Sequence, residues 1–195
     1  MEKHLVICIG RQFGSGGREI GLGLAKKLGI RFYDKEILKK AAEESGIVEE
    51  LFEKADEKPT NSFLYSLSMG THGQAMNFTN YNDYLTNDKL FLFQSNTIRD
   101  MAEKDSCVII GRCADYILRG RKDMLSVFIH APMELRIQRI SRVRNVEEDA
   151  ARSLIKKTDR QRANYYNFYA DNDWGRGRQL RRGHQLRQAG RGKIH

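Results

Sequence analysis

A glycine-rich turn lies between the first apolar segment of this chain and the amphipathic segment that follows it. Residues 5–9 read LVICI, which predicts a short buried strand. Residues 10–17, GRQFGSGG, interrupt that strand, and a helix is expected to begin at Arg18. A strand, a glycine turn and a helix N-terminus together direct backbone N–H groups at one point, so the segment predicts a phosphate-binding site.

The turn differs from the standard phosphate loop at the two positions that normally carry a charge and a hydroxyl. That loop reads G-x-x-x-x-G-K-[ST], whereas this chain, aligned on Gly16, has Gly17 and Arg18 after the last glycine. A tight connection without a ligand is the alternative, but four glycines within eight residues favour phosphate binding. We expect Arg18 to replace the lysine, because a guanidinium binds phosphate through two parallel hydrogen bonds.

Strand-like and helical segments alternate along the rest of the chain. The patterns predict strands over 30–33, 107–110 and 125–129, and helices over 18–28, 35–42, 48–55, 83–102, 133–143 and 147–169. Such alternation predicts an α/β fold, a three-layer sandwich in which helices cover both faces of a parallel sheet. The polar residues between them, about 57–81, are expected to form a mobile flap.

The basic charge of the chain is concentrated at its C-terminal end. The whole chain has a net charge of +9, but residues 175–195 hold six Arg, one Lys and no acid, which leaves 27 basic and 25 acidic residues elsewhere. This balance argues against a nucleic-acid partner. No apolar run has the length of a membrane span, so no membrane partner is expected. The cysteines Cys8, Cys107 and Cys113 lack metal-ligand spacing, and buried thiols in a reducing cytoplasm are the favoured interpretation.

Two further polar positions follow predicted strands. Arg112 comes directly after the strand at 107–110, so it is expected at the carboxyl edge of the sheet, where ligands of open α/β folds bind. Its alternative role is a surface ion pair with Asp115. Asp34 follows the strand at 30–33, and we favour a helix N-cap for it over an acid near the acceptor and a metal.

A late helix carries charged residues at spacings of three. Lys156, Asp159 and Arg162 are expected on one helix face. A helical lid, over about 145–170, that brings cations to transferring phosphates has this pattern. A solvated basic face has it too, and the segment alone does not separate the two.

With these clusters identified, the chain resembles the cytidylate kinase-like family, a branch of the P-loop nucleoside monophosphate kinases. The similarity is carried by GRQFGSGGREIG at 10–21, FYDKE at 32–36, GRCAD at 111–115, FIHA at 128–131 and DRQRANYY at 159–166. The family has a Gly-Arg-Asp motif whose arginine contacts the acceptor phosphate; Arg112 matches the arginine, and Cys113 stands in place of the aspartate. Its Arg-x-x-Asp-x-x-Arg lid is matched by Lys156, Asp159 and Arg162, with one conservative change.

The resemblance implies a P-loop fold, a nucleotide crevice, and ATP with Mg²⁺ as the phosphoryl donor. Together with the motifs it predicts three groups of site residues. The catalytic group is Arg18, Arg112, Lys156 and Arg162. The phosphate-binding group is Arg11, Gly14, Ser15, Gly16, Gly17 and Arg18. The acceptor-binding group is Asp34, Arg112, Asp115 and Asp159.

The C-terminal tail departs from the family. Residues 1–175 are expected to form one kinase-like domain, after which the family has an Asn-Tyr-Asp sequence and a last apolar strand. Residues 176–195 are instead basic and rich in glycine and glutamine. Codons for residues 175–187, chosen freely and read one nucleotide later, permit DAAGNYDVAINSG, so we hypothesise that the tail results from a frameshift.

The sequence therefore predicts a cytoplasmic phosphotransferase that passes the γ-phosphoryl group of ATP to a small nucleotide-like acceptor. Catalysis would consist of positioning and charge neutralisation, without a covalent intermediate. The replaced lysine and hydroxyl favour an alternative, a nucleotide-binding regulatory module with little or no transfer. The acceptor, the metal ligands and the oligomeric state are not determined by the sequence.

Overall fold

The structure, a computed structural model, describes residues 4–57, 79–170 and 172–175. Its strands are β1 (Val6–Arg11), β2 (Arg31–Tyr33), β3 (Cys107–Ile110) and β4 (Met124–Ile129). Its helices are α1 (Gly17–Leu28), α2 (Glu36–Ser45), α3 (Glu49–Ala55), α5 (Thr79–Lys104), α6 (Ala114–Ile117), α7 (Met133–Arg144) and α8 (Glu148–Tyr169).

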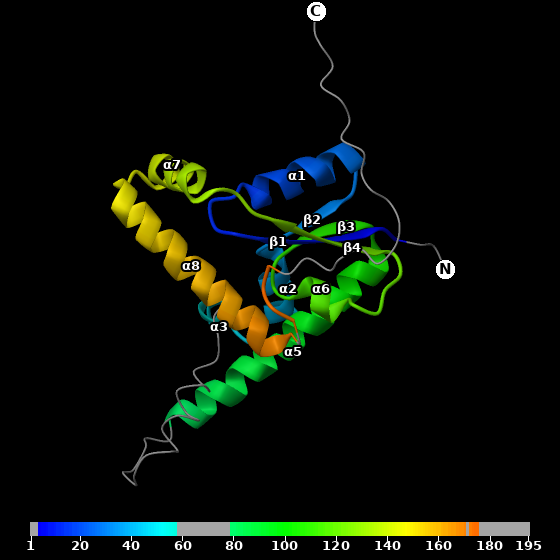
Figure 1. Cartoon of the computed structure of the whole chain (residues 1–195). Coiled ribbons are helices and arrows are strands. Elements are labelled where there is room, and N and C mark those ends of the chain that lie inside the picture. Colours follow the sequence, from blue (N-terminus) through cyan, green and yellow to red (C-terminus); the bar gives the residue numbers. More distant parts are fainter. Residues whose placement is uncertain (1–3, 58–78, 171, 176–195) are drawn as a thin grey trace, which may run out of the picture.

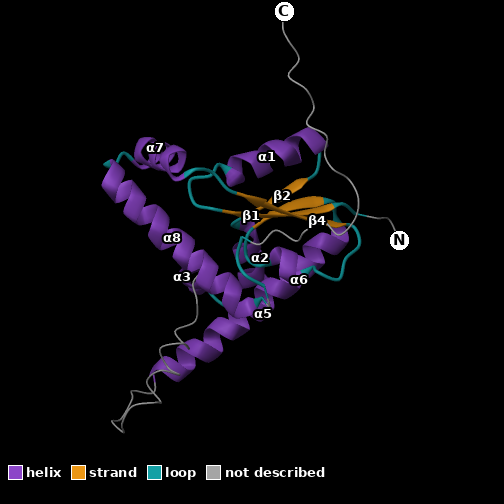
Figure 2. Ribbon diagram, viewed as in Figure 1, coloured by secondary structure: helices purple, strands orange, loops and turns teal. Residues whose placement is uncertain are grey.

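The four strands form one parallel sheet in the order β2-β3-β1-β4. Helix α1 covers one face of the sheet, and α2, α5 and α6 lie on the other (Figure 1). Figure 2 shows α7 and α8 beyond one end of the strands. The predicted three-layer α/β arrangement is confirmed.

The sheet is buried on both faces because its central strands are apolar throughout. Alternate side chains of β1 point to opposite faces: Ile7 and Ile9 pack with Ala25 of α1, whereas Val6 and Cys8 pack in the core on the α5 side. This double burial explains why β1 and β3 read as continuous apolar runs rather than as alternating patterns.

The predicted elements agree with the observed ones to within a few residues. Helix α1 ends as expected, at Gly29, whose φ of 64° is the left-handed conformation that glycine adopts without strain. Pro132 precedes α7, and α8 covers the whole of the late helical segment. Most of the expected flap, residues 58–78, and the tail after residue 175 lie outside the described residues.

The three cysteines are free and buried, as predicted. Burial raises the pKa of the Cys107 thiol to about 12, so this thiol is protonated at neutral pH. None of the described helices combines the length and the apolar character that crossing a membrane requires.

Candidate functional site

The glycine turn lies between β1 and α1, at the carboxyl edge of the sheet. Gly14 and Gly16 have φ values of 78° and 84°, a conformation that favours glycine. The buried Ser15 closes the turn, since its Oγ donates a hydrogen bond to the carbonyl of Gln12 at 2.8 Å. The turn leads into the N-terminus of α1 and has the form that the sequence predicted for phosphate binding.

The packing around Gly17 explains why no lysine stands there. A Cβ atom on Gly17 would lie 2.6 Å from the Cβ of Arg11 and 3.3 Å from the Cβ of Ile129. Both atoms sit next to the backbone and have little freedom to move. The position that carries the lysine of a standard phosphate loop therefore has no room for a side chain in this protein.

A cavity of about 420 Å³ adjoins the turn, within the usual size range of small-molecule sites. Its wall combines the turn and the start of α1 with charged side chains from five other parts of the chain. The side chains that concern the chemistry are Arg18, Asp34, Glu57, Arg112, Arg139 and Arg162.

Arg112 lies at the centre of this wall and is almost completely buried, with 1% of its side chain exposed. Its Nη1 donates to Asp34 Oδ1 and to the carbonyl of Ile110, both at 3.2 Å, and its Nη2 donates to Asp56 Oδ2 at 2.9 Å. The alternative of a surface ion pair with Asp115 is wrong, because the side chain turns inward under the sheet edge. The expectation that Arg112 faces the crevice is confirmed.

Asp34 is bound by two arginines instead of capping a helix. The N-cap position of α2 is Lys35, so the favoured N-cap role is wrong. Asp34 accepts a hydrogen bond from Nε of Arg18 at 2.7 Å as well as the one from Arg112. Burial acts to raise the pKa of Asp34, but these two guanidinium groups outweigh it and lower the pKa. The carboxyl group is therefore ionised at neutral pH.

Glu57 is a site residue that the sequence analysis missed. It follows the C-terminus of α3, and its carboxylate accepts hydrogen bonds from Nη1 of Arg11, Nε of Arg162 and the backbone N–H of Arg112. Burial acts to raise its pKa, but the charges of Arg11, Arg162 and Arg112 outweigh it and lower the pKa far below the ordinary value.

A sequence signal for this role existed at the end of α3. Asp56 and Glu57 stand where the helix dipole disfavours acids, so they need cations from elsewhere in the fold. The structure supplies those cations from β1, α8 and the segment after β3.

Helices α7 and α8 are joined to the glycine turn by one carboxylate. Asp159 of α8 accepts from the backbone N–H of Phe13 at 2.7 Å and from Nη1 of Arg136 of α7. Arg136, also missed by the sequence analysis, donates in addition to the carbonyl of Phe13 at 3.2 Å. Asp159 thus holds the turn in place.

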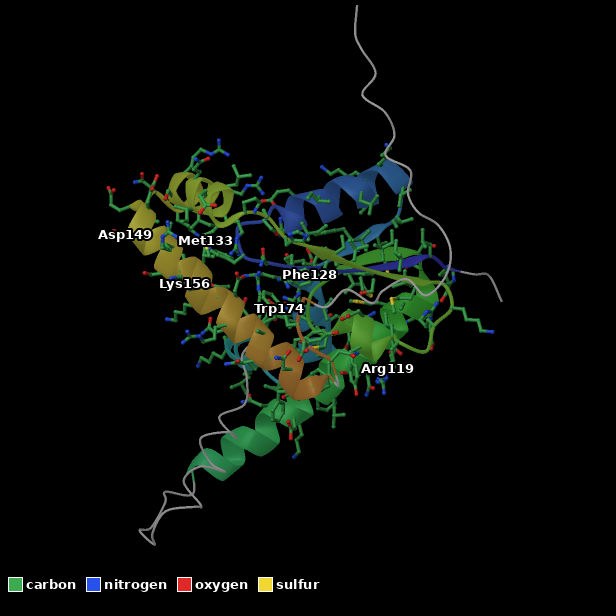
Figure 3. All side chains as sticks on the ribbon, in the orientation of Figure 1. Arg119, Phe128, Met133, Asp149, Lys156 and Trp174 are labelled. Carbon is green, nitrogen blue, oxygen red and sulfur yellow. The ribbon has the colours of Figure 1, made fainter. Side chains whose placement is uncertain are left out.

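The other two residues of the expected lid, Arg162 and Lys156, differ in their position relative to the cavity. Arg162 reaches the cavity, where it pairs with Glu57 at 2.9 Å and lies over the ring of Phe13. Lys156 is exposed on α8 and is not among the side chains that line the described cavity (Figure 3). The structure therefore brings Arg162, but not Lys156, to the glycine turn.

A second, smaller cavity of about 40 Å³ lies behind the charged wall. Asp115 is in it and accepts hydrogen bonds from the hydroxyl of Tyr166 at 2.8 Å and from Oγ of Ser126 at 3.5 Å. Phe128 and Trp174 close it with an edge-to-face contact, 5.2 Å between ring centroids (Figure 3). The residues that the two cavities share are Arg11, Glu57, Arg112 and Arg162.

Metal ligands are sparse in the part of the chain that the structure describes. It contains no cluster of three or more His, Cys, Asp or Glu side chains that is able to hold a metal ion. One oxygen stands out, since Oδ1 of Asp56 is buried and has no hydrogen-bond partner. Burial raises the pKa of Asp56, and the charge of Arg112 opposes this rise.

Known proteins with similar sequences or structures identify the family of this chain. A family model described as the cytidylate kinase-like family matches residues 6–180. No curated protein matches the sequence. An uncharacterized protein from Eubacterium ventriosum is 30% identical, with a TM-score of 0.61 over 88% of this chain and 81% of that one.

Two more distant solved structures are also similar to this chain. TT1252 from Thermus thermophilus is 12% identical, with a TM-score of 0.50 over 89% of this chain and 87% of that one. Shikimate kinase from Bacteroides thetaiotaomicron is 17% identical, with a TM-score of 0.48 over 84% and 82% of the two chains.

Proposed function

Because this chain belongs to the cytidylate kinase-like family and has the P-loop kinase-like α/β fold, we propose that it is an ATP-dependent phosphotransferase of the nucleoside monophosphate kinase type. Its acceptor would be a small nucleotide-like molecule. We further propose that it works in the cytoplasm and that nucleic acids and membranes are not its partners.

One observation carries this proposal: the glycine turn and six arginines line one cavity, and four of the six, including Arg139 and Arg144 of α7, come from distant parts of the chain. Arg11 and Arg18 flank the turn, Arg112 follows β3, and Arg162 comes from α8. Anionic substrates with two phosphorylated ends fit such a wall, because the turn offers N–H groups and the arginines offer bidentate donors.

The proposed transfer needs no covalent intermediate. The backbone of the turn binds the donor phosphates, Arg112 orients the phosphate of the acceptor, and Arg162 neutralises the transferring group. An acceptor oxygen attacks the γ-phosphorus while the bond from that phosphorus to the oxygen bridging the β- and γ-phosphates breaks. The electron pair of the broken bond stays on ADP.

Among the described residues, Asp56 offers an oxygen that would hold a magnesium ion arriving with ATP. Oδ1 of Asp56 is a hard ligand without another partner, and Asp56 lines the cavity. Mg²⁺ in kinase sites is held by one or two carboxylates, phosphate oxygens and water, so a single carboxylate fits. The ion would neutralise charge on the phosphates.

We propose that the acceptor binds in the small cavity that contains Asp115. Its aromatic side chains, Phe128, Tyr166 and Trp174, suit a planar base, and Asp115 is an acceptor for base N–H groups. At about 40 Å³ the cavity is too small for a base, so acceptor binding requires these side chains to move apart.

The alternative is a nucleotide-binding module with little or no transfer. It is favoured by the ion pairs of the wall, since Arg11, Arg18, Arg112 and Arg162 each have a carboxylate partner. An arginine held in this way must leave or share its partner before it binds a phosphate.

A kinase assay with a panel of nucleoside monophosphates and ATP–Mg²⁺ separates the two functions. The proposed function predicts turnover with at least one acceptor, and it predicts loss of that turnover in Arg112→Ala. ATP binding by calorimetry without turnover on any acceptor would support the regulatory module instead. Unchanged turnover in Arg112→Ala would contradict the role of Arg112.

A further inference from the structure

The phosphate site lacks a free cation at its usual place. Position 17 has no room for a side chain, as the contacts of Gly17 with Arg11 and Ile129 show. Arg18, the replacement expected from the sequence, has its Nε bound to Asp34 at 2.7 Å. Arg18 therefore shares its guanidinium with Asp34, which leaves a place at the turn for a cation from another part of the chain.

Arg139 of α7 lies directly over the turn. A Cβ atom on Gly16 would overlap with Nη1 of Arg139, so the guanidinium occupies the space where any other residue would carry its side chain. The residue is exposed, lines the 420 Å³ cavity and faces the N-terminus of α1.

Arg139 also differs from Arg136 in having no acid partner among the described residues. Within residues 4–57, 79–170 and 172–175 no carboxylate lies within ion-pairing distance of it. Arg136, one turn earlier on the same helix, is paired with Asp159. A guanidinium in a cavity without an acid partner is available to an anion.

The packing of α7 fixes Arg139 at this place. A Cβ on Gly14 would lie 3.0 Å from Cγ1 of Ile140 and 3.2 Å from Cβ of Arg136, so the helix touches the turn on both sides of Arg139. Residues 136, 139 and 140 share one face of the helix at spacings of three and four. The cation is thus held by the backbone of α7 rather than by partners of its own.

We propose that Arg139 binds the terminal phosphates of the nucleotide donor, in the place that lysine takes in a standard phosphate loop. The proposal deepens the proposed function and rests on it. The guanidinium of Arg139 would clamp the phosphates from above while the N–H groups of the turn bind them from below.

Calorimetry with inorganic triphosphate, ATP–Mg²⁺ and adenosine tests the proposal. Arg139→Ala is expected to weaken triphosphate and ATP binding about 10- to 100-fold, the usual range for a lost hydrogen bond to a charged group. Adenosine binding is expected to stay the same. Arg139→Lys keeps the charge and is expected to recover part of the loss.

Arg142→Ala is the matched control, because Arg142 is exposed on the same helix and does not line the described cavity. Its affinities should equal those of the wild type. Thermal melting of each variant checks the fold, which an exposed helical alanine is expected to preserve.

The outcomes separate the two proposals. Wild-type ATP affinity retained in Arg139→Ala, or an equal loss for adenosine, overturns the role of Arg139 and leaves the proposed function standing. A loss of triphosphate and ATP affinity in Arg144→Ala, and not in Arg139→Ala, also overturns it, because Arg144 is another cavity arginine of α7.

Triphosphate binding that depends on Arg139 without any kinase turnover supports the role of Arg139 and contradicts phosphoryl transfer. A wild type that binds neither triphosphate nor ATP contradicts both.

Discussion

Arg112 and Asp34 form a buried ion pair, 3.2 Å between Nη1 and Oδ1, although 78 residues separate them in the sequence. The pair joins the segments that follow β3 and β2, which are neighbours in the sheet. Asp56 and Arg18 extend it into a chain of alternating charges along the cavity wall. The parallel sheet explains this meeting, because the carboxyl ends of its strands share one edge.

Arg112→Ala is expected to destabilise the protein by about 3–5 kcal/mol, because the buried carboxylate of Asp56 loses its guanidinium partner and Asp34 keeps only Arg18. Urea unfolding at pH 7 measures the change. Arg142→Ala, at an exposed position of α7, should stay within about 0.5 kcal/mol of the wild type. A loss below about 1 kcal/mol in Arg112→Ala would show that the buried network contributes little.

Gly17→Ala is expected to cost about 1–3 kcal/mol through overpacking against Arg11 and Ile129, and to weaken ATP binding by displacing the turn. Gly23→Ala is the control in the same helix, where a Cβ meets nothing within 4 Å. It should stabilise the protein by up to about 1 kcal/mol, the helix propensity difference. Unfolding curves and ATP titrations of both variants provide the comparison, and equal stabilities would refute the steric argument.

Stability should decline at acid pH because Asp34 and Glu57 have lowered pKa values in the folded state. A carboxyl group of this kind stabilises the fold above its unfolded pKa, about 4, and loses that contribution as the pH falls towards its folded pKa. Glu57→Gln should therefore be less stable than the wild type at pH 7, with a gap that narrows towards pH 3. Urea unfolding at pH 7, 5 and 3 measures the gap, and a constant gap would contradict the ion pairing of Glu57.

Lys156→Ala and Arg162→Ala should differ in kinase activity. Arg162 lies in the cavity wall, so its loss is expected to lower kcat/KM by about 10- to 1,000-fold. Lys156 is exposed on α8 and outside the lining of the described cavity, so Lys156→Ala should keep activity within about twofold. A large loss in Lys156→Ala would mean that α8 moves on substrate binding and brings the lysine to the phosphates.

The strands, the helices and the glycine turn were predictable because their signals are local. Apolar runs marked β1 and β3, and Gly29 marked the end of α1. The partners of Arg112 and Asp34 were not predictable. Two local interpretations were wrong, the alternative ion pair of Arg112 with Asp115 and the favoured N-cap role of Asp34. Local alternatives consider only neighbours in sequence, whereas both side chains find their partners across the sheet.

The sequence by itself determined that a glycine turn after the first strand, a parallel α/β sheet and a set of arginines occur in one chain. Their local patterns are enough for this, because backbone conformation and apolar periodicity act over a few residues. The tertiary structure alone decided which arginines have carboxylate partners and which one lies over the turn. Packing of α7 against Gly14 and Gly16 puts Arg139 there, and such contacts between distant segments exist only in the folded chain.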